Sequence, residues 1–347
     1  MPWTKIFSNQ AEFDLALGGQ GLRALSFREA LVEAQRFLLQ DDPRVLLMGE
    51  GVDDPGAIFG STAGLAQSFG KDRVMDVPLA ENGMTGVAIG AALAGLRPIF
   101  IHMRNDFLPM CMDQLINHAA KWSYMTGGRV NVPLVVRSIV GRGWGSAAQH
   151  SQALHGLFLH VPGLKIVAPA TPYDAKGLLI AASRDGNPVM FFEHRWTFDY
   201  VGYVPAEAYQ VPLDQGVRRR QGSDATVVAI GWMVNEALKA AAALEAEGVS
   251  LEIIDPRTLL PLDMPLILES VAKTGRLVIA DTACHTGGTG AEIACRVAEW
   301  SPGALKAPVV RVDFPDAPTP ASTALEKTYY PDAEAIAQAV HRTLREG

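Results

Sequence analysis

Residues 164–193 read LKIVAPATPYDAKGLLIAASRDGNPVMFFE, and this stretch decides the class of fold. Its two ends, Leu164–Pro169 and Pro188–Glu193, are short apolar runs typical of buried strands. The segment between them predicts a helix over Tyr173–Arg184, because the dipeptide Thr171-Pro172 supplies a capping hydroxyl and a residue suited to the first helical position. A strand, a helix and a second strand in this order indicate a parallel sheet covered by helices.

The same alternation extends along the chain on both sides of this stretch. Toward the N-terminus, strands are expected at 45–48, 98–103 and 132–137, and helices at 81–96 and 107–125. Toward the C-terminus, strands are expected at 226–230, 251–255, 277–281 and 308–312, and helices at 235–247, 264–274, 290–300 and 333–345. The sequence therefore predicts an α/β protein of two doubly wound domains: residues 1–200, with an N-terminal extension at 1–25, then a linker at 201–222 rich in Gly, Pro and Arg, then residues 223–347.

Composition excludes several other classes of protein. The 347 residues carry a net charge of −7, which disfavours nucleic-acid binding. The three cysteines, Cys111, Cys284 and Cys295, form no CxxC pair, so neither a disulfide framework nor a zinc site is indicated. No run of apolar residues is long enough to span a membrane, and residues 1–17 lack the pattern of a signal peptide. We expect a cytoplasmic protein.

Ligands of open α/β sheets bind outside the carboxyl ends of the strands, so the strand-to-helix turns are the places to search. Glu81 follows an expected strand, Val74–Val77, and opens a helix of small residues. Its carboxylate either favours the helix dipole or exchanges a proton in the ligand crevice. Phe107, after the strand at 98–103, either belongs to the core or stacks on a flat heterocycle.

Two further turns have both a structural and a functional interpretation. The loop Ile139–Gln152 is long and glycine-rich and ends near His150. This histidine either caps the next helix or donates a proton or hydrogen bond, and the hinge-like glycine content favours function. The turn Arg184–Pro188 has the composition of a plain turn, although carbonyl groups in such a turn can hold a hard cation.

A series of short segments, each weak alone, is specific by its order and spacing. It includes Met48–Glu50, Phe69–Val74, Leu79–Glu81, Ala94–Pro98, Met112–Asn117, His150–Gln152, Pro172–Leu178, Asp255–Leu259, Lys273–Arg276 and Gly290–Ile293. The series covers nearly the whole chain and resembles the β subunits of thiamine-diphosphate-dependent 2-oxo acid dehydrogenases. This family, within the transketolase-like superfamily, includes pyruvate, branched-chain 2-oxo acid and acetoin dehydrogenases.

The resemblance implies a pyrimidine-binding domain followed by a transketolase C-terminal domain. It also implies an α2β2 heterotetramer built on a β–β dimer, with thiamine diphosphate shared between the α and β subunits and Mg²⁺ held by the α subunit. The chain lacks the family's Gly-Asp-Gly signature for magnesium diphosphate, which agrees with that division. Activity would then require the α subunit, and the acyl group from the 2-oxo acid would pass to a lipoyl-bearing acyltransferase.

The resemblance also assigns individual residues. Glu81 would hydrogen-bond the cofactor's pyrimidine, Phe107 would stack on it, and Leu79 and Met110 would lie beside it. His150 would assist reductive acylation of the lipoyl group. The backbone carbonyls of four residues match a structural potassium site of the family, which reverses the plain-turn interpretation; they belong to Leu134, Ala182, Asp185 and Asn187.

Some positions depart from the family's pattern. Met110 replaces a glutamine of some relatives, His102 and Arg104 replace less polar residues, and Cys284–Gly288 is unusual. These departures leave the identity of the 2-oxo acid open. Two alternatives also remain: half of a split transketolase-like enzyme that transfers a ketol or acyl group to an aldehyde, and a non-catalytic scaffold subunit. The retained Glu81 argues against the scaffold.

Overall fold

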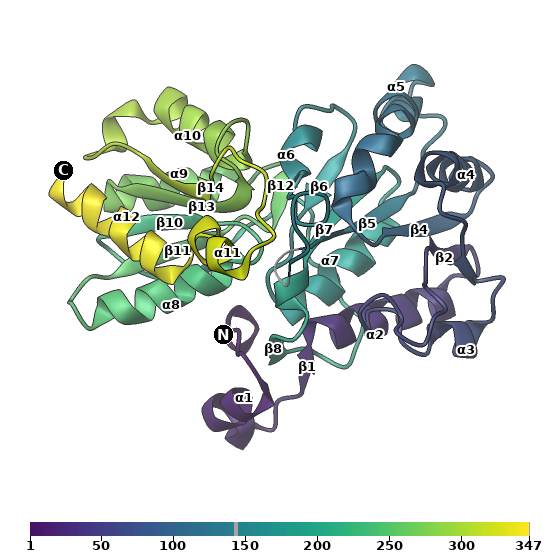
Figure 1. Ribbon diagram of the computed structural model, residues 1–347, viewed down its shortest axis with the longest axis horizontal. Coiled ribbons are helices and arrows are strands. Elements are labelled where there is room, and N and C mark those ends of the chain that lie inside the picture. Colours follow the sequence, from purple (N-terminus) through teal and green to yellow (C-terminus); the bar gives the residue numbers. More distant parts are fainter. Residues whose placement is uncertain (142–144, 347) are drawn as a thin grey trace. The chain divides into compact units, whose positions relative to one another are not determined.

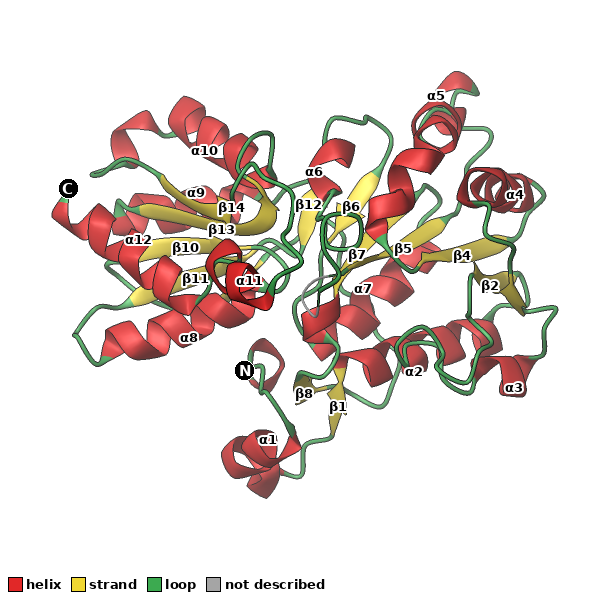
Figure 2. Cartoon of the chain, viewed as in Figure 1, coloured by secondary structure: helices red, strands yellow, loops and turns green. Residues whose placement is uncertain are grey.

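The computed structural model describes residues 1–141 and 145–346. The chain forms two compact units: unit 1 comprises residues 1–140 and 160–213, and unit 2 comprises residues 141–159 and 214–347. Each unit contains a mainly parallel sheet with helices on both faces (Figures 1 and 2). The predicted α/β class with two doubly wound domains is therefore confirmed.

Unit 1 is built on six parallel strands in the spatial order β6, β7, β5, β4, β2, β3. Helices α2 and α7 pack together below this sheet in Figure 1, and α4 lies above it. The elements of unit 1 are η1 (Pro2–Thr4), α1 (Gln10–Leu17), η2 (Gly18–Gln20), β1 (Ala24–Ser26), α2 (Phe27–Asp41), β2 (Val45–Gly49), α3 (Leu65–Phe69), β3 (Val74–Asp76), α4 (Glu81–Leu93), β4 (Arg97–His102), η3 (Asn105–Cys111), η4 (Gln114–Ala119), α5 (Trp122–Met125), β5 (Val135–Val140), β6 (Lys165–Val167), α7 (Pro172–Arg184), β7 (Val189–His194), η5 (Arg195–Thr197) and β8 (Val201–Tyr203).

Two expected elements of unit 1 differ in the structure. The strand expected at 132–137 begins at Val135 instead, after Pro133, which has no N–H to give to a sheet. The helix expected at 107–125 is broken into the 3-10 helix η3, the π-helix η4 and the short helix α5. Pro109 lies inside η3, where its ring and its missing N–H disfavour a regular α-helix.

Helix α2 was not among the expected elements, although its start signal is present in the sequence. The Ser26 side chain accepts a hydrogen bond from the Glu29 backbone amide, and the Glu29 carboxylate accepts one from the Ser26 amide. This reciprocal capping box satisfies two backbone donors that a helix start otherwise leaves unpaired. The helix buries one apolar face in the main core cluster of unit 1.

Unit 2 is built on strands in the spatial order β14, β13, β10, β11, β9, of which only β9 pairs antiparallel. Helices α8 and α12 pack together on one face, and α9 and α10 cover the other (Figure 1). The elements of unit 2 are α6 (His155–Phe158), β9 (Val217–Arg220), β10 (Ala225–Ala229), α8 (Met233–Glu245), β11 (Leu251–Asp255), β12 (Thr258–Leu260), α9 (Met264–Thr274), β13 (Leu277–Cys284), α10 (Thr289–Trp300), η6 (Pro302–Ala304), β14 (Val310–Phe314), α11 (Thr323–Tyr329) and α12 (Ala333–Arg345).

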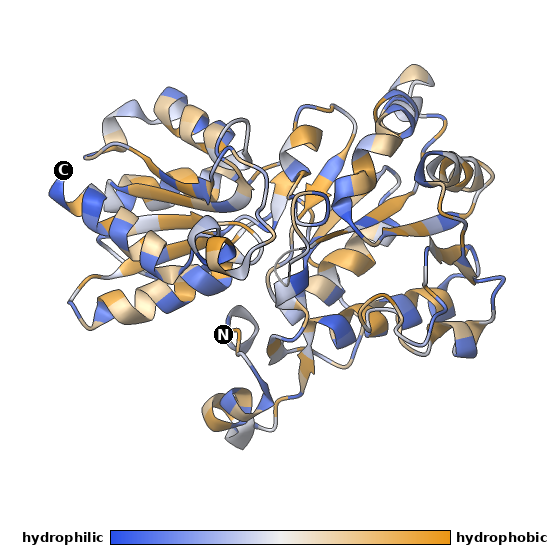
Figure 3. Cartoon of the chain, viewed as in Figure 1, coloured by the Kyte–Doolittle hydropathy of each residue, from blue (hydrophilic) through white to orange (hydrophobic). Residues whose placement is uncertain are grey.

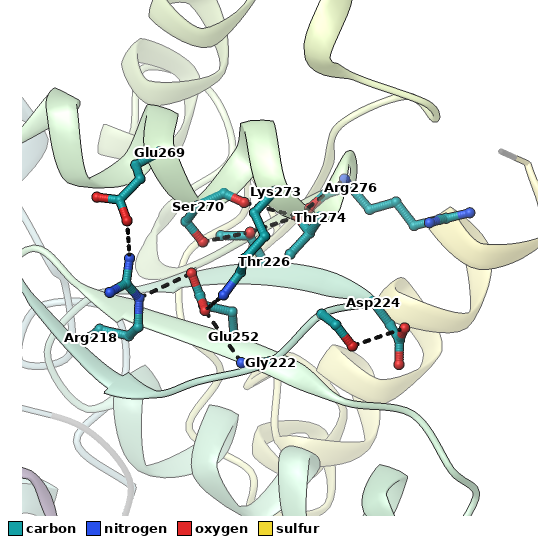
Figure 4. Close-up of polar contacts among 11 residues, drawn as sticks. Arg218, Gly222, Asp224, Thr226, Glu252, Glu269, Ser270, Lys273, Thr274 and Arg276 are labelled. Atoms are coloured by element: carbon teal, nitrogen blue, oxygen red, sulfur yellow. Dashed lines mark hydrogen bonds and ion pairs between the residues drawn. The ribbon is translucent and has the colours of Figure 1, made fainter.

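A buried carboxylate joins three of these elements. Glu252 on β11 accepts hydrogen bonds from Lys273 on α9 and from the Gly222 amide, and it pairs with Arg218 on β9 at 3.1 Å (Figure 4). One carboxylate oxygen thus accepts two hydrogen bonds and the other faces the Arg218 guanidinium, and this pairing offsets the burial of a charge with no solvent exposure. We interpret this network as structural.

The expected linker, residues 201–222, contains a short strand near each end. Strand β8 pairs antiparallel with β1 of unit 1, and β9 joins the sheet of unit 2. The strands of both sheets are predominantly hydrophobic (Figure 3), in keeping with their burial. Among the described residues, no helix combines the length and the apolar composition needed to cross a bilayer.

Candidate functional site

The direction of the strands locates a crevice in unit 1. Strand β2 is flanked by β3 on one side and by β4 on the other, so the chain changes direction across the sheet at β2. Parallel strands present their carboxyl ends at one edge, and ligands of such sheets bind where the strand order reverses. Glu50 follows β2, and Glu81 opens the helix that follows β3.

Glu81 is the first residue of α4, and its side chain is almost completely buried, with 9% exposure. The helix behind it is formed mainly of small residues, and the Thr85 hydroxyl donates to the Glu81 carbonyl at 2.7 Å. The first turn of a helix favours a negative charge, so the Glu81 carboxylate is well placed to interact with the dipole of α4. The same carboxyl group follows β3 at the carboxyl edge of the sheet, where ligands of such sheets bind.

Glu50 and Cys111 lie close enough to this carboxyl group to interact with its charge, and the His102 ring lies 4.0 Å from the Cys111 sulfur. Burial, followed by the charges of Glu81 and Asp76, raises the pKa of the Glu50 carboxyl above its ordinary value. Burial raises the pKa of the Cys111 thiol to about 11, with a further contribution from the Glu81 carboxylate. Burial also lowers the pKa of the His102 imidazole to about 4, so this ring is neutral near pH 7. The Glu50 carboxyl group and the Cys111 thiol thus lie in surroundings that disfavour a further negative charge.

Sequence reasoning did not single out Glu50 as a site residue. The signal was available, because Glu50 directly follows the apolar strand β2, where a side chain reaches the carboxyl edge. The adjacent Gly51 amide donates to the Asp76 carboxylate at 2.7 Å and joins the turns after β2 and β3.

The residues expected to contact a pyrimidine ring lie in the same unit. Phe107 is half-buried in η3, which packs against α4. Leu79, two residues before Glu81, and Met110, in η3, are 79% and 51% exposed. Exposed apolar residues that border a polar site are typical of a surface on which a ligand or a partner sits.

His150 lies in unit 2, not in the unit that carries Glu81. Arg142, Gly143 and Trp144 of the glycine-rich loop lie outside the described residues; beyond them, His150 is exposed in a turn in which Ala147 has a φ of 56°. The next helix, α6, has Leu154 at its N-cap position. His150 therefore does not cap that helix.

The four carbonyl groups expected to hold potassium lie on two adjoining segments. The Val189 amide donates to the Leu134 carbonyl at 2.9 Å and holds these segments side by side. The Asp185 amide donates to the Ala182 carbonyl at 3.2 Å, and an Arg97 nitrogen lies 3.4 Å from the Asp185 carbonyl. Each carbonyl oxygen has a second lone pair, so the donor set fits a hard cation in its chemistry.

Comparison with known proteins agrees with the two-unit architecture. Residues 23–198 match the family described as transketolase, pyrimidine binding domain, and residues 214–336 match transketolase, C-terminal domain. The split gene transketolase, solved as an inactive beta4 tetramer, superposes with a TM-score of 0.73 at 24% identity, covering 93% of this chain and 99% of that chain. The chain thus has the two domains of the transketolase-like class.

Sequence relatives define the family more narrowly. The acetoin:2,6-dichlorophenolindophenol oxidoreductase subunit beta of Cupriavidus necator is 45% identical, with coverage of 94% of this chain and 99% of the relative. The 2-oxoisovalerate dehydrogenase subunit beta of Bacillus subtilis is 40% identical over 94% of this chain and 100% of the relative. The pyruvate dehydrogenase E1 component subunit beta of Bacillus subtilis is 39% identical over 91% and 97%. The chain belongs to the family of β subunits of thiamine-diphosphate-dependent 2-oxo acid dehydrogenases.

Proposed function

We propose that this chain, together with an α subunit, decarboxylates a 2-oxo acid on thiamine diphosphate and transfers the acyl group to a lipoyl carrier. The observation that carries the proposal is the buried Glu81 carboxyl group at the carboxyl edge of a parallel sheet, near Glu50, whose pKa is raised first by burial and then by the charge of Glu81. When bound, thiamine diphosphate would supply a nucleophilic carbon for the oxo carbon of the substrate and a cationic ring able to take up the electron pair left by carbon dioxide.

Glu81 would hold the pyrimidine end of the cofactor. A carboxyl oxygen of Glu81 would hydrogen-bond a ring nitrogen of the pyrimidine and share a proton with it there. Burial strengthens such a bond, because little water competes for the carboxyl group. Phe107 would offer an aromatic face for stacking, and Leu79 and Met110 would contact the ring edge.

An α subunit would complete the site. The exposed apolar surfaces of Leu79 and Met110 support a partner on this side of unit 1. The chain lacks the family's magnesium-diphosphate signature, so the Mg²⁺ and the diphosphate would be held by the α subunit in an α2β2 assembly. The chain alone would then bind the cofactor weakly and be inactive.

His150 would act at the later acyl-transfer step. Its exposed imidazole can donate a proton or a hydrogen bond to a lipoyl sulfur. The carrier would be a lipoyl-bearing acyltransferase. A potassium ion on the carbonyls of Leu134, Ala182, Asp185 and Asn187 would brace unit 1 away from these steps.

The test uses the chain co-expressed with its α subunit. Glu81→Gln keeps the size of the side chain but removes the acid, and we expect decarboxylation measured with a dye acceptor to fall by about 10²–10⁴-fold. Glu12→Gln is the matched control, because Glu12 is an exposed first-turn carboxylate of α1; its activity should be unchanged. Activity of Glu81→Gln equal to that of the control would show that Glu81 only serves the helix dipole.

Binding and acceptor measurements test the rest of the assignment. Calorimetry should detect tight binding of thiamine diphosphate and magnesium only when the α subunit is present, and tight binding by this chain alone would refute the shared site. Turnover with an aldehyde acceptor in the absence of lipoyl protein would instead favour a split transketolase-like enzyme, to which the chain has a likeness of fold alone.

A further inference from the structure

A buried histidine–aspartate pair lies in unit 2. His155 is the first residue of α6, and its Nε2 atom lies 3.0 and 3.1 Å from the two carboxylate oxygens of Asp281 on β13. The side chains are 3% and 0% exposed. The two residues are 126 positions apart in the sequence. The pair therefore joins the end of the loop that carries His150 to the sheet of unit 2.

Asp281 keeps its charge in this position. Burial by itself would raise the pKa of Asp281, but the His155 imidazole and the Ala283 amide hold that pKa below its ordinary value. Asp313 is also buried, and its burial, followed by the charge of Asp281, raises the pKa of Asp313 to about 8. Asp281 is thus the charged member of these two acids, and its loss would take from the buried Nε2 atom of His155 the carboxylate that lies 3.0 Å away.

Backbone packing supports the same contact. A Cβ atom added to Gly156 would lie 3.0 Å from the Gly287 carbonyl oxygen, and one added to Gly288 would lie 2.7 Å from the Cys284 carbonyl oxygen. Helix α6 therefore sits directly on the turn 284–288 that follows β13. The unusual sequence Cys284–Gly288 supplies the surface on which α6 rests.

A second contact holds the other end of the described loop. The Gly145 amide donates to the Glu326 carboxylate of α11 at 3.3 Å. His150 lies between this contact and the His155–Asp281 pair, and both contacts are within unit 2. The backbone that carries His150 is thus held within unit 2 at both ends of residues 145–154.

We propose that His155 and Asp281 are positioning residues that fix the loop 145–154, and hence His150, for acyl transfer to the lipoyl group. The proposal rests on the function proposed for His150. A catalytic group displaced by about 1 Å can lose on the order of 10²-fold in rate, so a local buried contact can control one step of the reaction. Decarboxylation depends on Glu81 in unit 1 and does not require this contact.

The experiment uses the complex of this chain with its α subunit and compares two half-reactions. His155→Gln and Asp281→Asn should lower the kcat for reductive acylation of a free lipoyl domain by about 10- to 100-fold. The dye-coupled decarboxylation rate should stay within about 2-fold, because His155 and Asp281 have no role in the step proposed for Glu81. Asp255→Asn is the matched control, because it breaks another buried ion pair of unit 2, the one to Arg219. In this control the ratio of the reductive acylation rate to the decarboxylation rate should not change.

Hydrogen exchange of amides 145–154 provides a readout that is independent of activity. Exchange should become faster in His155→Gln and Asp281→Asn but not in Asp255→Asn. Gly156→Ala, which crowds the Gly287 carbonyl without removing a charge, should have the same effect and replaces the other variants if they do not assemble. Unchanged exchange in these variants would overturn the positioning role.

His150→Asn separates the two proposals. If His150→Asn loses acyl transfer while His155→Gln retains it, the positioning role is wrong and the role of His150 stands. If His150→Asn itself transfers acyl groups at the normal rate, the proposed function of His150 fails, and hydrogen exchange alone then decides whether His155 and Asp281 hold the loop.

Discussion

Arg137 offers the sharpest prediction about stability. This arginine lies on β5 with no solvent exposure and donates to Glu193 on β7 at 2.5 and 2.9 Å. It also donates to the Gln35 side chain of α2 at 2.7 Å and to the Ser61 hydroxyl at 3.0 Å. One guanidinium thus joins two strands, a helix and the segment that follows the left-handed residues 57–59.

Arg137→Met should remove all four hydrogen bonds while filling most of the volume. Breaking a buried ion pair by removing one partner costs about 3–5 kcal/mol, because the remaining charge is left buried and unpaired. This corresponds to a rise of roughly 10²- to several 10³-fold in the ratio of unfolded to folded chains. Urea unfolding followed by circular dichroism measures the change, as a lower transition midpoint for unit 1.

Two further variants make the measurement decisive. Arg184→Met breaks an ion pair to Asp41 whose side chains are 40% and 48% exposed, and we expect it to cost less than about 1 kcal/mol. The double variant Arg137→Met, Glu193→Met removes both buried charges and should recover much of the lost stability. A cost for Arg137→Met no larger than that of Arg184→Met would refute the reasoning.

Three other predictions concern separate parts of the chain. Iodoacetamide at pH 8 should modify the exposed Cys295 in the folded chain but Cys111 only after unfolding, because burial raises the pKa of Cys111 to about 11; mass spectrometry of the labelled peptides checks this. Burial and a neighbouring carboxylate raise the pKa of Asp313 to about 8, so the folded chain holds a proton there that the unfolded chain releases, and stability should fall as the pH rises from about 4 to 8. Asp313→Asn should flatten that dependence of stability on pH. Melting temperatures that fall equally with pH in the parent chain and in Asp313→Asn would contradict the prediction. Ser26→Ala removes the side-chain cap of α2 and should cost about 0.5–2 kcal/mol in chemical unfolding, whereas no change would mean that the Glu29 carboxylate compensates.

Local patterns in the sequence were enough for much of the fold. The Thr171 hydroxyl accepts the Asp174 amide at 3.0 Å, as the capping pattern predicted, and α7 spans Pro172–Arg184. Glu81 opens α4 at the predicted position. These features depend on residues within a few positions of one another, so hydrophobic spacing, caps and breakers suffice to predict them. The same logic explains the division of the expected helix near Pro109, because a proline inside a helix is a local signal that breaks it.

Contacts between distant residues were decided by the tertiary structure. Arg137 is a charged residue inside a buried strand, and only its pairing with Glu193, 56 positions away, makes that burial tolerable. The pairing of His155 with Asp281, and the grouping of residues 141–159 with unit 2, likewise have no local signal. Sequence alone determined the two α/β domains, the family and the strand-to-helix turn that carries Glu81. Which charges meet in the core had to come from the structure, because the desolvation cost of a buried charge is offset only by a partner that packing, not spacing along the chain, brings to it.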